Sequence, residues 1–189
     1  MDVNDLKSLN AEVKKRMAGA IDHLRHELAG VRTGRASTGI LDPVHVEAYG
    51  TRMPLNQLAS LSVPEPTMIV AQPFDPTLMG AIEKAIRASD LGLNPNNDGK
   101  MIRIPVPPLT EDRRKELSRH VHKMAEEARN AIRTVRRDAN DRLKKLAKDK
   151  AVSEDDEKRG LEEIQKITDQ EIKQVDELQK KKDAELLSH

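Results

Sequence analysis

All ten prolines of this 189-residue chain lie between Pro43 and Pro108, and this confinement limits what the chain can fold into. Proline fixes φ and removes a backbone hydrogen-bond donor, so long helices exclude it from their interiors. Six of the nine glycines, which also interrupt regular structure, lie between Gly34 and Gly99. The sequence therefore predicts two architectures in one chain: long helices in the flanking segments, and an inserted domain of another kind between them.

The flanking segments carry apolar residues at steps of three and four, the period of an amphipathic helix. We predict a first helix over residues 6–31, a second that follows the N-cap Thr110, and a third from about Ser153 to about Leu187. Three helices with apolar stripes of similar length favour an intramolecular bundle, and the inserted domain disfavours the alternative, an extended dimeric coiled coil. The predicted seams are Leu6, Leu9, Val13, Met17, Ala20, Leu24, Leu28 and Val31; Leu117, Val121, Met124, Ala128, Ala131, Val135, Ala139, Leu143 and Leu146; and Leu161, Ile164, Ile167, Ile172, Val175 and Leu178.

The middle segment alternates between strand and turn signals. Asp75 followed by Pro76 is typical of a helix start, with Asp75 as the N-cap. The sequence predicts strands at 44–49, 53–61 and 67–71, a helix from residue 76, and a hairpin of 91–93 with 101–104. The predicted fold class is therefore α+β: a long three-helix bundle formed by 1–31 and 107–189, with a small inserted β/α/β domain at 32–106.

The chain crosses between the two predicted domains twice, and we expect a hinge at these crossings because few buried contacts would oppose motion there. The hinge residues are Arg32, Thr33, Gly34, Arg35, Pro105, Val106, Pro107 and Pro108. Arg32 and Arg35 are also functional candidates, and the competing explanation for them is ion pairing that fixes the linker.

Residues 129–148 place a basic face beside an apolar one. At about 100° per residue, the cations of this stretch gather roughly a third of a turn away from the apolar seam. Arginine dominates the centre of this face, and its planar guanidinium suits bidentate contact with phosphate. The competing interpretation is a solvated charged flank. The candidate nucleic-acid-binding residues are Arg129, Arg133, Arg136, Arg137 and Lys144.

The formal charge is unevenly distributed along the chain. Residues 111–151 carry fourteen basic and eight acidic residues, a net of +6, whereas residues 152–189 carry seven and twelve, a net of −5. This asymmetry favours a helical body with one basic face. It also leaves open a helical scaffold that binds a partner protein through its acidic third helix. Salt separates the two hypotheses, because binding through phosphates weakens steeply as salt rises.

Several classes of function lack the residues that they need. The chain has no cysteine, its histidines lack the zincin spacing, and no glycine-rich phosphate loop or nucleophile with a base is present. We therefore predict no metal, no cofactor and no enzymatic activity. No signal peptide or apolar run of ~20 residues is found, which favours a cytoplasmic protein without membrane attachment. Tyr49 and Phe74 are the only aromatic residues, so nucleic acid would be recognised through phosphates and shape.

A series of short motifs resembles the bacterial ribosome recycling factor family, in the family's order and over nearly the whole chain. They are Val31-Arg-Thr-Gly-Arg-Ala36, Tyr49-Gly50, Pro54-Leu55, Ala85-Ile86, Ser89-Asp-Leu-Gly-Leu-Asn-Pro95, Asp98-Gly99, Ile102-Arg103, Pro107-Pro-Leu-Thr110, Arg113-Arg114, Val135-Arg-Arg-Asp-Ala-Asn-Asp141, Lys148-Asp-Lys150, Ser153-Glu-Asp155 and Gln165-Lys-Ile-Thr-Asp169.

The resemblance implies an L-shaped, hinged protein without enzymatic activity of its own. It implies that the protein acts with elongation factor G and GTP to split the post-termination ribosome into subunits. The bundle would contact large-subunit rRNA near the inter-subunit bridges, with Arg133 and Arg136 matching the family's RNA-contacting arginines. The small domain would be the part moved by elongation factor G. A self-sufficient bundle further favours a monomer.

Overall fold

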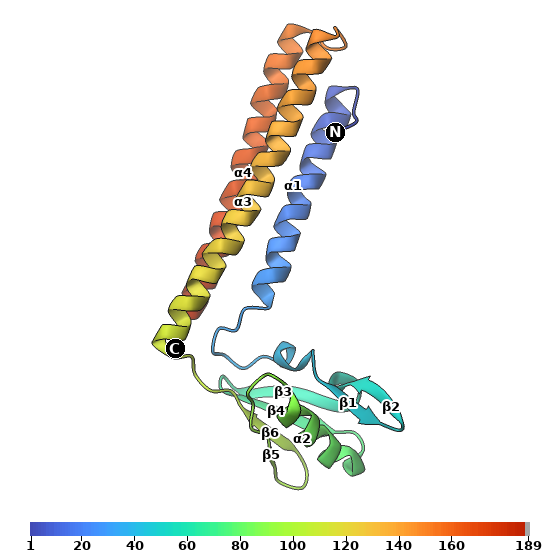
Figure 1. Cartoon of the computed structure of the whole chain (residues 1–189), viewed down its shortest axis with the longest axis vertical. Coiled ribbons are helices and arrows are strands. Elements are labelled where there is room, and N and C mark those ends of the chain that lie inside the picture. The colour runs from blue at the N-terminus through green and yellow to red at the C-terminus, as the bar shows by residue number, and fades with distance from the viewer. Residues whose placement is uncertain (188–189) are drawn as a thin grey trace. The chain divides into compact units, whose positions relative to one another are not determined.

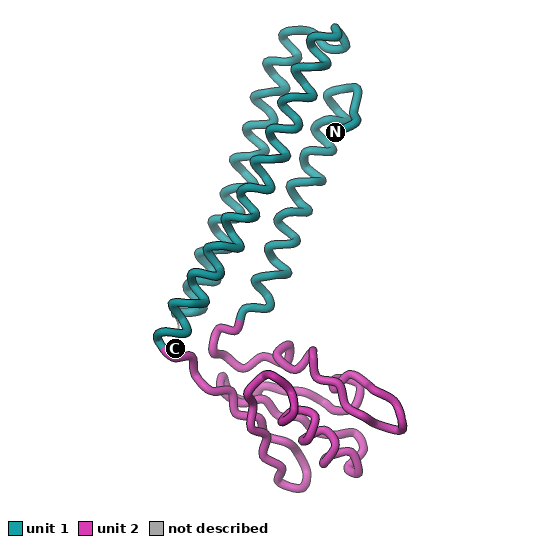
Figure 2. Tube along the Cα trace, in the orientation of Figure 1, with its two compact units in different colours: residues 1–31, 111–188 teal, residues 32–110, 189 magenta. Residues whose placement is uncertain are grey.

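The structure, a computed structural model, describes residues 1–187, so the last two residues of the predicted bundle segment 107–189 lie outside the described residues. Three long helices form one compact unit: α1 (Leu6–Ala29), α3 (Glu111–Lys148) and α4 (Glu154–Leu187) (Figure 1). Residues 32–110 form the other unit (Figure 2). A helical bundle with a small inserted sheet domain confirms the α+β fold class.

Each of the three long helices packs against the other two, and their apolar stripes bury one another. Two alanines expected in the seams lie elsewhere: Ala131 is exposed, and Ala20 is only half-buried because Ile21 takes the core position. A period of 3.6 residues makes a seam drift round a long helix, so a fixed choice of steps misplaces some positions. The buried residues of α1 and α3 are Leu9, Val13, Met17, Ile21, Leu24 and Leu28, and Leu117, Val121, Met124, Ala125, Ala128, Ile132, Val135, Ala139, Leu143 and Leu146.

A short turn reverses the chain between α3 and α4. The Lys150 N–H donates to the Ala147 carbonyl and the Ala151 N–H to the Leu146 carbonyl, while Lys150 adopts a φ of 57°, as in a Schellman motif. The Ser153 hydroxyl then accepts from the Asp156 N–H at 3.0 Å and caps α4, as its sequence predicts. This tight reversal places α4 antiparallel to α3.

Gly160 lets α4 approach its neighbours closely. A methyl group built on Gly160 would lie 2.6 Å from Leu143 Cδ2 and 3.2 Å from Leu6 Cδ2. Leu143 is fully buried, so it has little room to move. The glycine therefore supports contact among all three helices near the α3–α4 turn.

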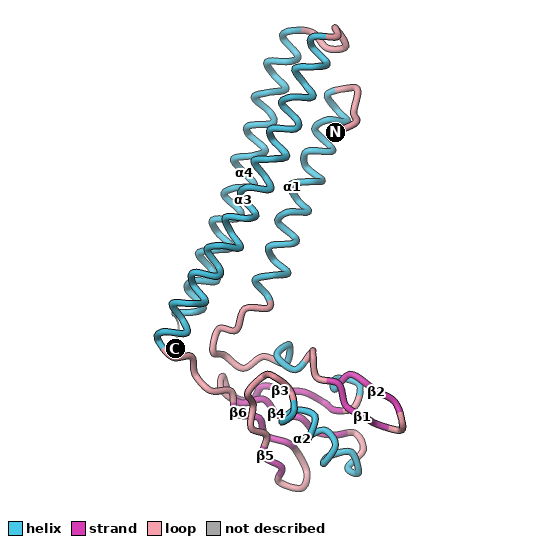
Figure 3. Tube along the Cα trace, viewed as in Figure 1, coloured by secondary structure: helices cyan, strands magenta, loops and turns pink. Residues whose placement is uncertain are grey.

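The inserted domain contains a hairpin and a four-stranded antiparallel sheet (Figure 3). The hairpin pairs β1 (His45–Ala48) with β2 (Thr51–Pro54). The sheet has the order β3 (Ala59–Glu65), β4 (Met68–Pro73), β6 (Ile102–Pro105), β5 (Asn96–Asn97). Helix α2 (Met79–Ala88) follows a 3-10 turn (Pro76–Leu78) that Asp75 caps, and two further 3-10 turns span Thr38–Leu41 and Leu55–Gln57.

Two strand predictions for this domain were wrong in detail. The predicted strand 53–61 is two strands in different sheets, because the turn at Leu55–Gln57 interrupts it. The hairpin that ends the domain is real, but its first arm is Asn96–Asn97, and the Leu93 side chain instead lies in the core. In both places an apolar run marks burial without marking extended structure, an ambiguity that short runs carry.

Candidate nucleic-acid interface

Four cations on α3 form what we call the cationic strip: Arg133, Arg136, Arg137 and Lys144. Within residues 1–187 none of the four forms an ion pair. Arg133 donates to the Asn130 amide oxygen at 3.3 Å, and Arg136 donates to the Gln165 amide oxygen at 3.4 Å. These partners are neutral, so they orient the two guanidinium groups without cancelling their charge. Arg137 and Lys144 are exposed.

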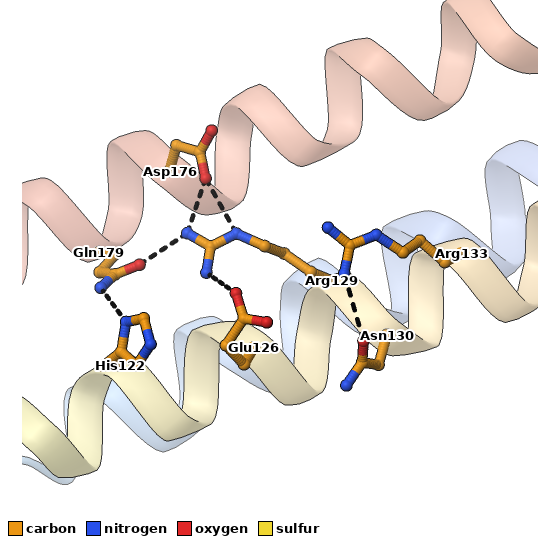
Figure 4. A network of polar contacts seen from close by, with 7 residues as sticks. All are labelled: His122, Glu126, Arg129, Asn130, Arg133, Asp176 and Gln179. Carbon is orange, nitrogen blue, oxygen red and sulfur yellow. Dashed lines mark hydrogen bonds and ion pairs between the residues drawn. The ribbon is translucent and has the colours of Figure 1, made fainter.

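Arg129, predicted to belong to the same face, has a different environment (Figure 4). Its guanidinium crosses to α4, where Nε and Nη2 donate to Asp176 Oδ1 at 3.0 and 2.6 Å and Nη2 also donates to Gln179 Oε1 at 2.6 Å. Nη1 donates to Glu126 Oε1 at 2.6 Å, and the side chain is only 11% exposed. The side-chain amide nitrogen of Gln179, Nε2, lies 3.1 Å from His122 Nδ1 and extends the network.

The network keeps the Arg129 guanidinium charged and engages it in hydrogen bonds within the bundle. Burial by itself would lower the pKa of Arg129, but the hydrogen bonds and negative charges of Asp176 and Glu126 outweigh it and raise the pKa. Each of the three nitrogens of this guanidinium donates to a partner in the bundle. The structure therefore gives Arg129 the role of joining α3 to α4, and a phosphate would have to displace two carboxylates to reach it.

Sequence reasoning missed this separation of Arg129 from its neighbours. Glu126, three residues earlier on the same helix, is one signal that could have found it, since such pairs meet on a helix surface. The acidic character of the third helix is another. Neither signal identifies Asp176 as the partner, because that contact depends on the register of α4 against α3.

Two further arginines of the bundle are occupied on the side that faces α1. Arg142 donates to the Val3 carbonyl and to the Asn4 side chain, both at 2.7 Å. Arg16 of α1 pairs with Asp138 of α3 at 3.2 Å. Arg129, Arg142 and Arg16 are thus occupied by contacts within the bundle, whereas the four cations of the cationic strip meet no carboxylate within residues 1–187.

The predicted hinge residues lie mostly within the small domain. Arg32 donates to the Leu91 carbonyl at 3.3 Å, and Gly34, with a φ of 81°, packs against Leu109. The Ala36 N–H donates to the Pro66 carbonyl at 2.6 Å, and the Val106 N–H donates to the Thr67 carbonyl at 2.8 Å. Both linkers are therefore tied to the β3–β4 turn.

The remaining hinge candidates differ in burial and in the element to which they belong. Pro105 ends β6 and Val106 is buried in the small-domain core, whereas Pro107 and Pro108 are exposed. Thr33 is half-buried and Arg35 is exposed.

Two further kinds of feature are absent from the described residues: a metal-ion cluster and a membrane-spanning helix. Among residues 1–187 no three His, Asp or Glu side chains converge as a metal ion would require. None of the described helices is long and apolar enough to cross a membrane.

Comparisons with known proteins agree over the whole length of the chain. Residues 24–187 match the sequence model of the ribosome recycling factor family. The ribosome-recycling factor of Carboxydothermus hydrogenoformans is 55% identical over 97% of this chain and 99% of its own. That of Chloroflexus aggregans is 54% identical over 98% of this chain and 99% of its own.

Two solved structures are similar in fold as well as in sequence. A solution structure of a ribosome recycling factor has a TM-score of 0.76 and 43% identity, with full coverage of both chains. The T. thermophilus factor, described as bound with E. coli elongation factor G to the E. coli post-termination complex, has a TM-score of 0.63 and 52% identity. That alignment covers 97% of this chain and 99% of the other.

Proposed function

The chain belongs to the ribosome recycling factor family, whose members are non-enzymatic translation factors, and we propose that it grips large-subunit rRNA with the cationic strip of α3. With elongation factor G and GTP it splits the post-termination ribosome into subunits. The observation that carries the proposal is the line of four cations without a carboxylate partner. Structured RNA displays phosphates at regular spacing, and such a line of cations fits it without base stacking.

The site of contact is the large-subunit rRNA near the inter-subunit bridges. Arg133 and Arg136 are the centre of this contact, because neutral amides already hold their guanidinium groups in place. Arg137 and Lys144 widen it. Arg129 stands behind this surface as a structural residue, since its charge is used within the bundle.

Splitting the ribosome requires force on the inter-subunit bridges as well as binding to the rRNA. The small domain rotates relative to the bundle while the bundle stays anchored, and elongation factor G supplies the energy from GTP. The predicted hinge stretches 32–35 and 105–108 absorb this rotation. At the first crossing, the Val31 N–H is bonded to the Leu28 carbonyl of α1 and the Ala36 N–H to the β3–β4 turn, so the residues between them are the ones left to turn. The protein works as a monomer in the cytoplasm, where translation takes place.

A partner-protein scaffold built on the acidic α4 is the weaker candidate. Asp176, one of its acids, is occupied by Arg129, and Asp183 accepts from Ser118 at 3.2 Å. These acids hold the bundle together, so fewer remain for a partner.

The test is light scattering of purified post-termination ribosomes mixed with this protein, elongation factor G and GTP. A fall in scattering that needs all three additions supports the proposal, and its rate ranks variants of the cationic strip. Binding of the protein alone to ribosomes, measured between 50 and 200 mM salt, is expected to weaken by at least about tenfold. A folded protein that leaves scattering unchanged contradicts the proposal, and salt-independent binding would favour the scaffold.

A further inference from the structure

The only two aromatic residues of the chain are both on the surface of the small domain. Tyr49 is 69% exposed and Phe74 is 68% exposed, while the domain core is built from aliphatic side chains. Aromatic rings bring a large apolar area into any contact that covers them, and they dominate many protein interfaces. Both aromatic rings of the chain are therefore accessible to a binding partner.

Tyrosine is an unfavourable residue for the backbone conformation at position 49. Ala48 pairs with Thr51, so Tyr49 and Gly50 form a two-residue hairpin loop between β1 and β2 (Figure 1). Their φ values are 52° and 76°, as in a type I′ turn, for which Asn-Gly is the favoured pair. A bulky residue with positive φ is strained, so tyrosine serves something other than turn stability here.

A hydrogen bond holds the Tyr49 ring in place. Its hydroxyl donates to Asp75 Oδ2 at 2.7 Å, and the Thr77 N–H and hydroxyl donate to Asp75 Oδ1 at 3.0 and 2.7 Å. Phe74 precedes Asp75, and its N–H donates to the Leu58 carbonyl at 3.0 Å. The Tyr49 ring is therefore held beside the Asp75 carboxylate, and the backbone of Phe74 is fixed next to it in the chain. The Tyr49 side chain then has less freedom to lose on binding.

The charge of this carboxylate is maintained at neutral pH. The hydrogen bond from Tyr49, followed by those from Thr77, lowers the pKa of Asp75. The same bond to Asp75 raises the pKa of Tyr49, so the phenol stays neutral and keeps donating. The surface thus combines a fixed negative charge with two apolar rings.

We propose that Tyr49, Phe74 and Asp75 form a docking patch for a partner protein that presents an arginine or lysine side chain beside apolar surface. A cation is attracted to the faces of the rings and to the carboxylate, and the rings exclude water from the contact. The inference deepens the proposed function and rests on it, because the partner protein is sought in the recycling reaction.

Charge argues against RNA as the occupant of this patch. Residues 32–110 carry seven basic and seven acidic residues, in contrast to the excess of cations on α3. The charged member of the patch is an acid, and Arg52, the nearest basic residue along the hairpin, lies opposite the acidic Glu47 in the register of the two strands. A polyanion would meet repulsion from Asp75 without a compensating cluster of cations.

The partner can be identified by crosslinking from inside the patch. Phe74→p-benzoylphenylalanine keeps an aromatic ring and adds a photoreactive group, and the same amino acid at the exposed Lys84 on α2 is the matched control. The full-length variants are irradiated in the complete reaction with purified ribosomes, elongation factor G and GTP. We expect a protein peptide with a nearby arginine or lysine to be crosslinked from position 74 and not from position 84. Crosslinks to rRNA, or none beyond those of the control, would overturn the proposal.

A second arm uses variants that stay folded. Tyr49→Asn fits the type I′ turn and removes the ring, so its melting temperature should equal or exceed that of the wild type. We expect its splitting rate, and that of Phe74→Ala, to fall by about tenfold or more. Wild-type rates in both variants overturn the docking patch alone. If the wild-type chain itself splits no ribosomes, the proposed function fails and this inference fails with it.

Discussion

The bundle and the inserted domain present opposite kinds of surface. The four cations of the cationic strip on α3 lack carboxylate partners, whereas the inserted domain is balanced in charge and exposes two aromatic rings. Uncompensated cations suit a polyanion that is read through its phosphates, and exposed rings beside an acid suit a protein. The two proposed contacts, with RNA and with protein, would therefore use separate residue classes in separate units of one chain of 189 residues.

The largest expected effect comes from reversing charge on the cationic strip. The double variant Arg133→Glu with Arg136→Glu should bind ribosomes about a hundredfold more weakly at low salt, because two phosphate contacts become repulsions. The matched control, Lys84→Glu with Lys100→Glu, makes the same change of charge on exposed lysines of the inserted domain and should stay within about twofold. Equilibrium binding of labelled protein to ribosomes measures both. Equal losses in the two variants would break the comparison, since net charge alone would then decide binding.

Substitutions of two arginines of α3 should distinguish a structural role from a role in ribosome binding. Arg129→Met leaves Glu126 and Asp176 without their shared cation, so we expect the free energy of unfolding in urea to fall by about 1–3 kcal/mol. Arg137→Met removes an exposed side chain and should change that free energy by less than about 0.5 kcal/mol. Ribosome affinity should show the reverse order, with the loss at Arg137. If a stable, folded Arg129→Met variant bound ribosomes more weakly than the wild type, Arg129 would be an RNA contact after all.

Two glycines of the bundle should respond in opposite directions to the same substitution. Gly160→Ala places a methyl group against Leu143, and we expect a net destabilisation of about 1–2 kcal/mol. Gly19→Ala meets nothing within 4 Å in the middle of α1 and should stabilise by about 0.5–1 kcal/mol. Thermal unfolding of the two variants beside the wild type measures the difference. A stabilised Gly160→Ala variant would mean that the core yields more easily there than its burial indicates.

The smallest effect concerns pH and the inserted domain. Hydrogen bonds from the Met101 and Lys100 N–H groups lower the pKa of Asp98 below its ordinary value. A group whose folded-state pKa is lowered stabilises above the unfolded value of about 3.9, and this stability is lost as pH falls through the folded value. The melting temperature of the wild type should therefore exceed that of Asp98→Asn at pH 7, and the gap should close near pH 2. A gap that is independent of pH would show that the charge of Asp98 contributes nothing.

The local pattern of the chain predicts its elements because those signals act over a few residues. The three- and four-residue spacing gives α1, α3 and α4, and the Asp75–Pro76 pair gives the turn that leads into α2. The motifs of the ribosome recycling factor family are also local, and the comparisons confirm that resemblance. The interruption of the predicted strand 53–61 was missed, although Pro54, the N-cap residue of the turn Leu55–Gln57, lies inside that strand and is a signal that could have found it.

The sequence by itself determined the fold class, the long helices, the family and the basic stretch from which the candidate site is drawn. Only the tertiary structure decided which of those cations are available: Arg129 turns to Asp176, forty-seven residues away in the chain, while Arg133 and Arg136 meet only amides. It also decided that Tyr49 lies beside Asp75. The physical reason is the distance along the chain over which each interaction acts. Helix propensity and capping depend on neighbours along the chain, whereas the partner of a charge depends on which helix or strand packs across from it.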